Sequence, residues 1–194
     1  RTTAAGTAPD VTMPTLVVRH APDRAPALRY LRAAAAAWRI DDGTRSHGAA
    51  NARRAPVDAA GTAKPLPANA RLLVWLAPGA LPATVRDWIE AGGVALLDAR
   101  AELPGIEDGT ARWRNADGDV MVRGIALGRG QALQWTRALT PAEMPELLEA
   151  VFPQRLRALL LPAPPATARV AAVAHAPLAG ARPWPEAPRE LAPW

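Results

Sequence analysis

Residues 71–98 read RLLVWLAPGALPATVRDWIEAGGVALLD, and this stretch decides the fold. Its apolar run at 72–76 is typical of a central parallel strand covered on both faces. A short helix begins at Leu81-Pro82 and ends at Gly92-Gly93, where glycine supplies the left-handed residue that closes a helix. The apolar run at 94–97 predicts a second buried strand. Strand, helix and strand together predict a βαβ unit with a right-handed crossover.

The residues before this unit predict another strand and another helix. Residues 15–20 are a short β-branched and apolar run, which indicates a buried strand. Asp23 can cap the following segment, with Pro26 in its first turn, and apolar side chains at helical spacing predict a helix that ends near Ile40. In the loose stretch that follows, residues 53–58 predict a weak strand.

After the βαβ unit the pattern changes to alternation. Residues 112–114 and 120–123, separated by a short segment with a glycine, predict an antiparallel hairpin. Gly128-Arg129-Gly130 then turns the chain into a further strand at 132–135. A lone Gly-x-Gly between two strands is a turn rather than a phosphate loop.

The last part of the chain divides into a helical pattern and a tail. Residues 142–161 carry apolar side chains at helical spacing, Leu148 and Val151 among them, so they predict a helix that Pro153 kinks or splits. Residues 162–194 are rich in proline, which predicts an extended tail rather than regular structure.

These elements predict an α/β fold with three layers, in which a mostly parallel sheet lies between helices and is extended by an antiparallel hairpin. Residues 14–161 form this domain. Residues 1–13 are a disordered lead-in, and the Pro-rich tail at 162–194 follows the domain. Three tryptophans, Trp75, Trp88 and Trp135, are expected in its core.

Composition excludes several kinds of chemistry. The chain has no Cys, so disulfides, thiolate metal sites and a Cys nucleophile are absent. Its one serine, Ser46, does not lie in a Gly-x-Ser-x-Gly elbow. The three histidines, His20, His47 and His175, are far apart and lack metal-ligand spacing. The sequence therefore predicts no metal site and no cofactor.

The net charge of +5 first suggests an anionic partner such as nucleic acid. Only Lys64 among the 23 basic residues is a lysine, and the arginines are scattered singly among Ala and Pro. Aromatic residues interleaved with these arginines, as base stacking would require, are missing. We expect no nucleic-acid binding, and keep an anionic-surface or nucleic-acid binder through the scattered Arg residues as an alternative.

The order of motifs in 72–98 resembles the class I glutamine amidotransferase-like fold, a flavodoxin-like structure: an apolar strand, Ala-Pro-Gly, a helix ending in Glu-Ala-Gly-Gly, and a second strand. A second resemblance covers the latter half of the chain. The motifs LGRGQ at 127–131, LTP and MPEL within 139–147, and VFPQRL at 151–156 are similar to the segment before the final membrane helix of BatA-like membrane proteins. The two resemblances together cover residues 14–176.

The BatA-like resemblance implies a soluble domain between transmembrane helices, with a pair before it and one after it. A very basic loop between the first two helices stays cytoplasmic in such proteins, which places the domain in the periplasm at the inner membrane. The sequence begins at Arg1 rather than with Met, and we expect it to come from a longer protein. The tail ending at Trp194 suits a lead-in to a membrane helix, because Trp favours the interface.

The amidotransferase resemblance also locates the position of the family's nucleophile, a Cys in a sharp turn after the second strand. That position falls on Asp98. The flanking glycines are missing, and no His-x-Glu pair follows to act as base and orienter. The resemblance therefore implies the fold, argues against the family's reaction, and leaves no catalytic residue to predict.

Four residues are candidates for ligand binding, because parallel sheets bind ligands outside the carboxyl ends of their strands. Asp98 ends one strand, and Arg100 is positioned to hold it or to pair with an anionic ligand. Arg19 and His20 end the first strand, next to where the strand order should reverse. The alternative is that Asp98 caps the following turn, that Arg100 is solvated and that His20 is a loop residue.

The sequence thus predicts a non-catalytic periplasmic interaction or ligand-binding domain of a membrane-anchored protein, with a protein partner at or near the membrane. The enzymatic alternative is a degenerate amidotransferase-like hydrolase or transferase that uses Asp98. Such an enzyme needs a second catalytic group close to Asp98 in the fold.

Overall fold

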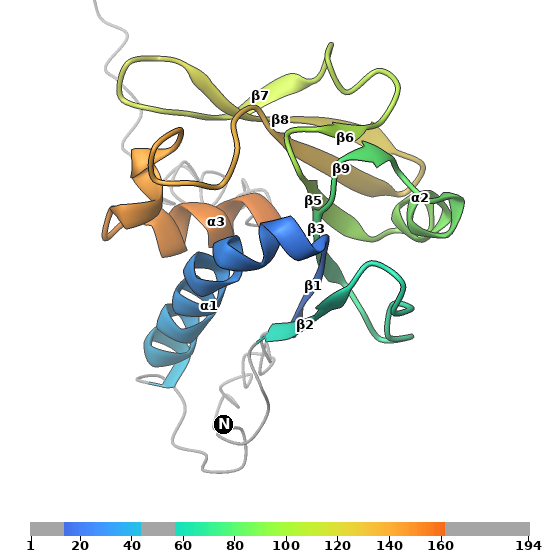
Figure 1. The fold of residues 1–194 in the computed structure, drawn as a ribbon, viewed down its shortest axis with the longest axis horizontal. Coiled ribbons are helices and arrows are strands. Elements are labelled where there is room, and N and C mark those ends of the chain that lie inside the picture. The colour runs from blue at the N-terminus through green and yellow to red at the C-terminus, as the bar shows by residue number, and fades with distance from the viewer. Residues whose placement is uncertain (1–13, 44–56, 162–194) are drawn as a thin grey trace, which may run out of the picture. The chain divides into compact units, whose positions relative to one another are not determined.

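The structure is a computed structural model that describes residues 14–43 and 57–161 (Figure 1). The predicted lead-in at 1–13, the Pro-rich tail at 162–194 and the first part of the predicted weak strand lie outside the described residues.

Seven strands of the described region form one sheet. Their bounds are β1 Leu16–His20, β2 Val57–Gly61, β3 Leu72–Leu76, β5 Val94–Leu97, β7 Thr110–Arg114, β8 Val120–Leu127 and β9 Gly130–Trp135. The strand order is β2-β1-β3-β5-β9-β8-β7. The first five strands in this order are parallel, whereas β8 runs antiparallel to both β9 and β7. This confirms the predicted parallel sheet with an antiparallel hairpin extension.

The parallel strands have the flavodoxin-like order. Counted along the chain, the second parallel strand lies at the edge, followed by the first, third, fourth and fifth. The chain leaves β1 outward to β2, then returns to the other side of β1 to form β3. The direction of winding therefore reverses between β1 and β3.

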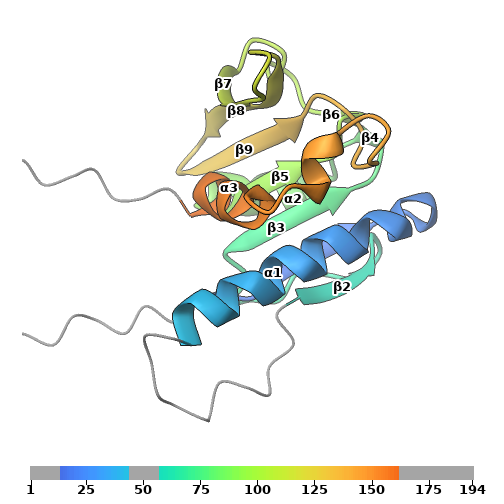
Figure 2. The same cartoon turned by 90° about the vertical axis from the view of Figure 1, so that its left-hand side faces the viewer.

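The helices lie on both faces of the sheet, as Figures 1 and 2 show. On one face lie α1 (Leu28–Gly43) and α3 (Phe152–Leu160), drawn in blue and orange, and on the other lies α2 (Ala83–Glu90), drawn in green. The strand side chains facing α1 and α3 are Leu16, Val18, Leu72, Val74, Leu76, Leu96 and Leu133. Those facing α2 are Val17, Leu73, Trp75, Ala95, Leu97 and Ala132. This alternation along buried strands confirms the three-layer α/β fold.

The predicted βαβ unit is present. Strands β3 and β5 are parallel neighbours, with Leu72 opposite Val94, and α2 connects them. Two-residue strands, β4 (Gly79–Ala80) and β6 (Ala101–Glu102), pair with each other beyond the carboxyl ends of β3 and β5. Within the described residues, no helix has the length and apolar composition that crossing a bilayer requires.

The helix after β1 differs from the prediction at both ends. A 3₁₀ helix, η1 (Pro22–Ala27), precedes α1, and α1 continues past Ile40 to Gly43. Asp23 makes no capping hydrogen bond, so its predicted role is wrong. Pro26 lacks an N–H and disfavours the α conformation in the residue before it, so the chain takes tighter turns until Leu28.

Within the described residues the weak strand is β2, which runs from Val57 to Gly61 and so continues three residues past the predicted end at Asp58. The parallel register with β1, from Leu16 opposite Val57 to His20 opposite Gly61, sets the length of β2.

The helix predicted at 142–161, kinked or split at Pro153, is split in the structure, and its first part is not an α-helix. A 3₁₀ helix, η3 (Pro145–Leu148), and the separate helix α3 take its place. Pro153 lies in the first turn of α3, where its missing N–H costs nothing, so it begins a helix rather than kinking one. As a result Leu148 is 69% exposed and Val151 is 45% exposed, instead of facing the core.

Candidate functional site

Asp98 follows β5 and is only 3% exposed. Its Oδ1 accepts a hydrogen bond of 2.9 Å from the backbone N–H of Arg100, which forms an Asx turn. Its Oδ2 lies 3.0 Å from Nε of Arg24 in an ion pair. The Nε–H of Arg24 lacks hydrogen-bond geometry, so charge attraction holds this pair. Both carboxylate oxygens are therefore engaged by groups of the domain itself.

A glutamine braces the backbone around Asp98 from the neighbouring strand. The buried amide of Gln134, in β9, donates to the carbonyl oxygens of Asp98 at 3.2 Å and of Ala101 at 2.6 Å. Sequence reasoning missed both Gln134 and Arg24. Gln134 could have been found as a polar residue inside an apolar strand. No local pattern in the sequence links Arg24 to Asp98, which lies far along the chain.

The guanidinium of Arg100 does not hold Asp98, and the side chain of Arg100 is exposed. Only its backbone N–H contacts the carboxylate. This arrangement matches the alternative in which Asp98 caps the turn after β5 and Arg100 is solvated.

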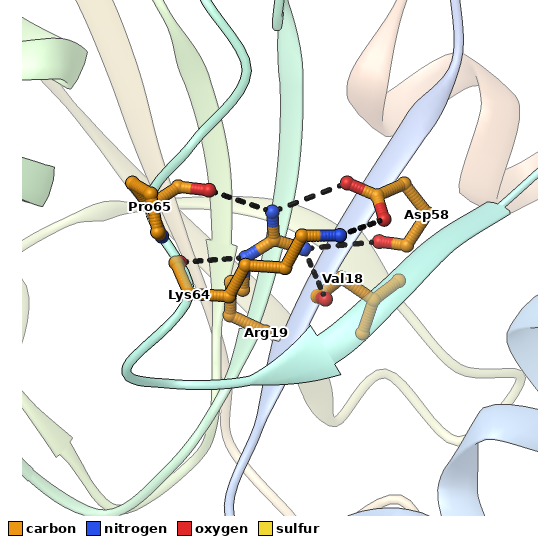
Figure 3. Close-up of polar contacts among 5 residues, drawn as sticks. All are labelled: Val18, Arg19, Asp58, Lys64 and Pro65. Atoms are coloured by element: carbon orange, nitrogen blue, oxygen red, sulfur yellow. Dashed lines mark hydrogen bonds and ion pairs between the residues drawn. The ribbon is translucent and has the colours of Figure 1, made fainter.

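Arg19 is fully buried, and its guanidinium is completely occupied (Figure 3). Nε donates to the carbonyl oxygen of Lys64 at 3.0 Å, and Nη2 donates to the carbonyl oxygen of Pro65 at 2.9 Å and to Oδ2 of Asp58 at 3.1 Å. Nη1 donates to the carbonyl oxygens of Val18 at 3.0 Å and Asp58 at 3.1 Å. All five N–H groups are used. Ligand binding by Arg19 would require breaking this set, which ties the loop after β2 to the sheet.

Asp58 joins two cations in this cluster. Its Oδ2 pairs with Arg19, and its Oδ1 lies 3.1 Å from Nζ of Lys64. Burial raises the pKa of Asp58, but hydrogen bonds from Lys64 and Arg19, together with their charges, outweigh burial and lower the pKa below its usual value of 3.8. Sequence reasoning missed this cluster, because a single Asp in a weak strand is equally typical of a solvent-exposed edge strand.

The lowered pKa of Asp58 predicts a stability that depends on pH. A carboxyl whose folded-state pKa is depressed stabilises the fold above its unfolded pKa, and this contribution is lost as the pH falls through the folded value. We expect Asp58→Asn to lower the free energy of unfolding at neutral pH, and the difference from the wild type to shrink below about pH 4. Urea unfolding of both proteins across this range measures it; a constant difference would contradict the assignment.

His20 lies at the end of β1, partly buried, with Nδ1 donating to the carbonyl oxygen of Ala21 at 3.0 Å. Alternation along β1 places His20 on the face opposite to Arg19. Strand β3 separates β1 from β5, so the backbones of His20 and Asp98 are two strand spacings apart, roughly 10 Å. The structure therefore does not gather the four predicted residues into one site.

The contacts of Asp98 with described residues stabilise the turn after β5 and include no group suited to catalysis. The charged side chain that contacts Asp98 among the described residues is Arg24, a group without a titratable proton near neutral pH. The described residues also hold no cluster of three Asp, Glu or His side chains suited to a metal ion.

A cavity lies on the face of the sheet that α2 covers, between α2 and the loop after β2. It has a volume of about 390 Å³ and is lined by Thr62, Ala63, Lys64, Pro65, Leu66, Trp75, Pro82, Thr84, Val85 and Trp88. The prediction that Trp75 and Trp135 lie in the core is confirmed, whereas Trp88 is only partly buried and packs against the core. Asp98 does not line this cavity.

Comparison with family models, curated proteins and solved structures finds no match to this chain. The geometry of the described residues therefore carries the functional argument.

Proposed function

We propose that this domain is a non-catalytic recognition module of a membrane-anchored protein, facing the periplasm and binding a protein partner or a ligand near the membrane. The observation that carries its non-catalytic character is the engagement of Asp98. One carboxylate oxygen caps a turn and the other pairs with Arg24, so no oxygen is left to attack a substrate. Arg24 cannot serve as the base that a nucleophile needs.

The location is supported by the BatA-like resemblance of residues 127–156. The absence of Cys from this chain makes a labelling test direct. Ala116→Cys, at an exposed hairpin turn, should be labelled in the full-length protein by a membrane-impermeant maleimide applied to cells with permeabilised outer membranes. The unsubstituted protein gives the background. Labelling that requires lysis of the inner membrane would overturn the periplasmic location.

The non-catalytic character is tested at Asp98. We expect release of ammonia from glutamine at the rate of a protein-free blank for the wild type, and no change for Asp98→Asn. Asn keeps an oxygen that accepts the hydrogen bond from Arg100, so the turn persists and only the attraction to Arg24 is lost. The variant should therefore unfold with a free energy lower by about 1–2 kcal/mol. Turnover in the wild type that disappears in Asp98→Asn would establish the enzymatic alternative instead.

A further inference from the structure

The cavity of about 390 Å³ lies where the winding of the sheet reverses. Its floor includes Trp75, the penultimate residue of β3, which is directly opposite Arg19 of β1. After β1 the chain forms α1 on one face, and after β3 it forms α2 on the other. In open parallel sheets the ligand crevice lies between two strands related in this way.

A loop replaces a helix over this part of the sheet. The connection between β2 and β3, residues 62–71, contains neither helix nor strand, so among the described residues a loop follows β2 on the α2 side of β1. The cavity occupies the space between this loop and the first two turns of α2.

Both walls of the cavity contact the rest of the domain. Arg19 fixes the loop through the carbonyl oxygens of Lys64 and Pro65. On the other side, the ring of Trp88 lies so close to Gly93 that a Cβ at position 93 would collide with it. Gly93 therefore provides the space in which the indole of Trp88 lies. The loop wall is therefore formed before a ligand arrives, as is usual for ligand pockets.

The lining indicates what the cavity accepts. The indoles of Trp75 and Trp88, together with Pro65 and Pro82, offer flat apolar surfaces that suit a planar ring. Lys64 is the one charged lining residue, and its side chain is 55% exposed. It retains donor capacity, because an ammonium has three N–H groups and Asp58 is its one hydrogen-bond partner among the described residues. Of the residues that the structure describes, no acidic one lines the cavity.

We propose that this cavity binds a small planar aromatic carboxylate, with the ring between the indoles and the carboxylate at Lys64. The volume fits one small molecule, near the lower end of the usual range of about 300–1,000 Å³. This inference deepens the proposed recognition function by naming a site and a ligand class, and it rests on that function.

The test uses naphthalene-2-carboxylate as the probe and its neutral carboxamide as the matched probe. In ¹H–¹⁵N spectra of the whole chain, the carboxylate should shift the indole N–H signals of Trp75 and Trp88, and leave those of Trp113 and Trp135 in place. Lys64→Gln should weaken binding of the carboxylate about tenfold and leave binding of the carboxamide unchanged.

A variant that fills the cavity from an exposed position tests binding without unfolding the domain. Thr84 is exposed at the mouth of the cavity, so Thr84→Phe should abolish probe binding without disturbing the core. Asp87→Phe places the same ring on the same helix outside the cavity, and should bind the probe like the wild type.

Three results would overturn the ligand proposal: no indole shift at millimolar probe, shifts confined to other tryptophans, or a Thr84→Phe variant that still binds. A proline-rich peptide that shifts the same two indoles when the probe does not would assign the cavity to a peptide instead. None of these results bears on the labelling at Ala116→Cys or on the ammonia assay, so failure of the ligand site and failure of the proposed function are distinguishable.

Discussion

Replacing Arg19 with Met should lower the free energy of unfolding by about 3–5 kcal/mol, the range seen when one partner of a buried ion pair is removed. Arg19 is fully buried and satisfies five acceptors at once. Met fills the space of the aliphatic stem but donates no hydrogen bond. The loss of stability in Arg19→Met therefore comes from acceptors left without a donor, because an unsatisfied buried acceptor costs more free energy than a typical hydrogen bond contributes.

The loss of stability should depend on the planar guanidinium, whose N–H groups point in several directions, and not on the positive charge alone. Lys in place of Arg keeps the charge, but an ammonium cannot reach carbonyl oxygens on the loop and Asp58 on β2 from a single point. We therefore expect Arg19→Lys to remain destabilised, by less than Arg19→Met. The cluster attaches the loop after β2 to strand β1.

Arg129→Met is the matched control for Arg19→Met. Arg129 is exposed and makes one hydrogen bond through its side chain, from Nη2 to the carbonyl oxygen of Ala91 at 3.1 Å. Its replacement should change the free energy of unfolding by no more than about 0.5 kcal/mol. Urea unfolding of the three variants and the wild type measures the differences. Equal effects at positions 19 and 129 would mean that the buried cluster stabilises nothing.

The sheet was predictable because the sequence of each central strand is apolar throughout. The apolar runs at 72–76 and 94–97 leave no polar face, so both strands had to lie between two layers of helices. Gly92 adopts a φ of 120° after α2, as expected from its position in the Gly pair. Local rules of this kind do not depend on distant partners.

The bounds of the C-terminal helical segments were not predictable, because a periodic pattern does not reveal where helices begin. Apolar spacing continues through 142–161, yet Pro145 and Pro153 each start a separate segment. A proline favours the first turn of a helix as strongly as it disfavours the interior. Periodicity therefore grouped Leu148 and Val151 with the core, when both are exposed.

The sequence predicted the position of Asp98 at the end of a strand, but not the groups that contact it. Asp98 lies at the carboxyl end of β5, as expected, but Arg24 reaches it from η1 rather than Arg100 from the next turn. Arg19 was expected to be available at a strand end. Its partners in the β2 strand and the following loop are 39 to 46 residues further along the chain. Pairing at such separations is decided by the packed fold, because spacing in the sequence does not encode it.

Gly130→Ala should destabilise the domain by about 3 kcal/mol, near the upper end of overpacking penalties. Gly130 begins β9 where this strand passes against the turn between α2 and β5. A Cβ there would collide with the carbonyl oxygens of Ile89 and Gly93. These atoms cannot yield, because the adjacent N–H groups of Arg129 and Gln131 donate to the carbonyl oxygens of Glu90 at 2.9 Å and Gly93 at 3.1 Å.

Gly61→Ala separates this steric cost from the general effect of replacing glycine. Gly61 ends β2, and beyond its chain neighbours no heavy atom lies within 4 Å of the place that a Cβ would take. Its φ is not positive, so alanine there should be neutral or slightly stabilising. Gly130 also lacks a positive φ, so the backbone conformations of both sites accept alanine and only the neighbouring atoms differ.

The midpoints of urea unfolding compare the two glycine variants with the wild type. We expect Gly130→Ala to unfold at a clearly lower urea concentration than Gly61→Ala, because only the first variant pushes a methyl group into backbone atoms. If the two midpoints coincide, the close approach of β9 to the α2–β5 turn does not exist in solution. In that case the Gly-x-Gly at 128–130 is a turn with no packing role.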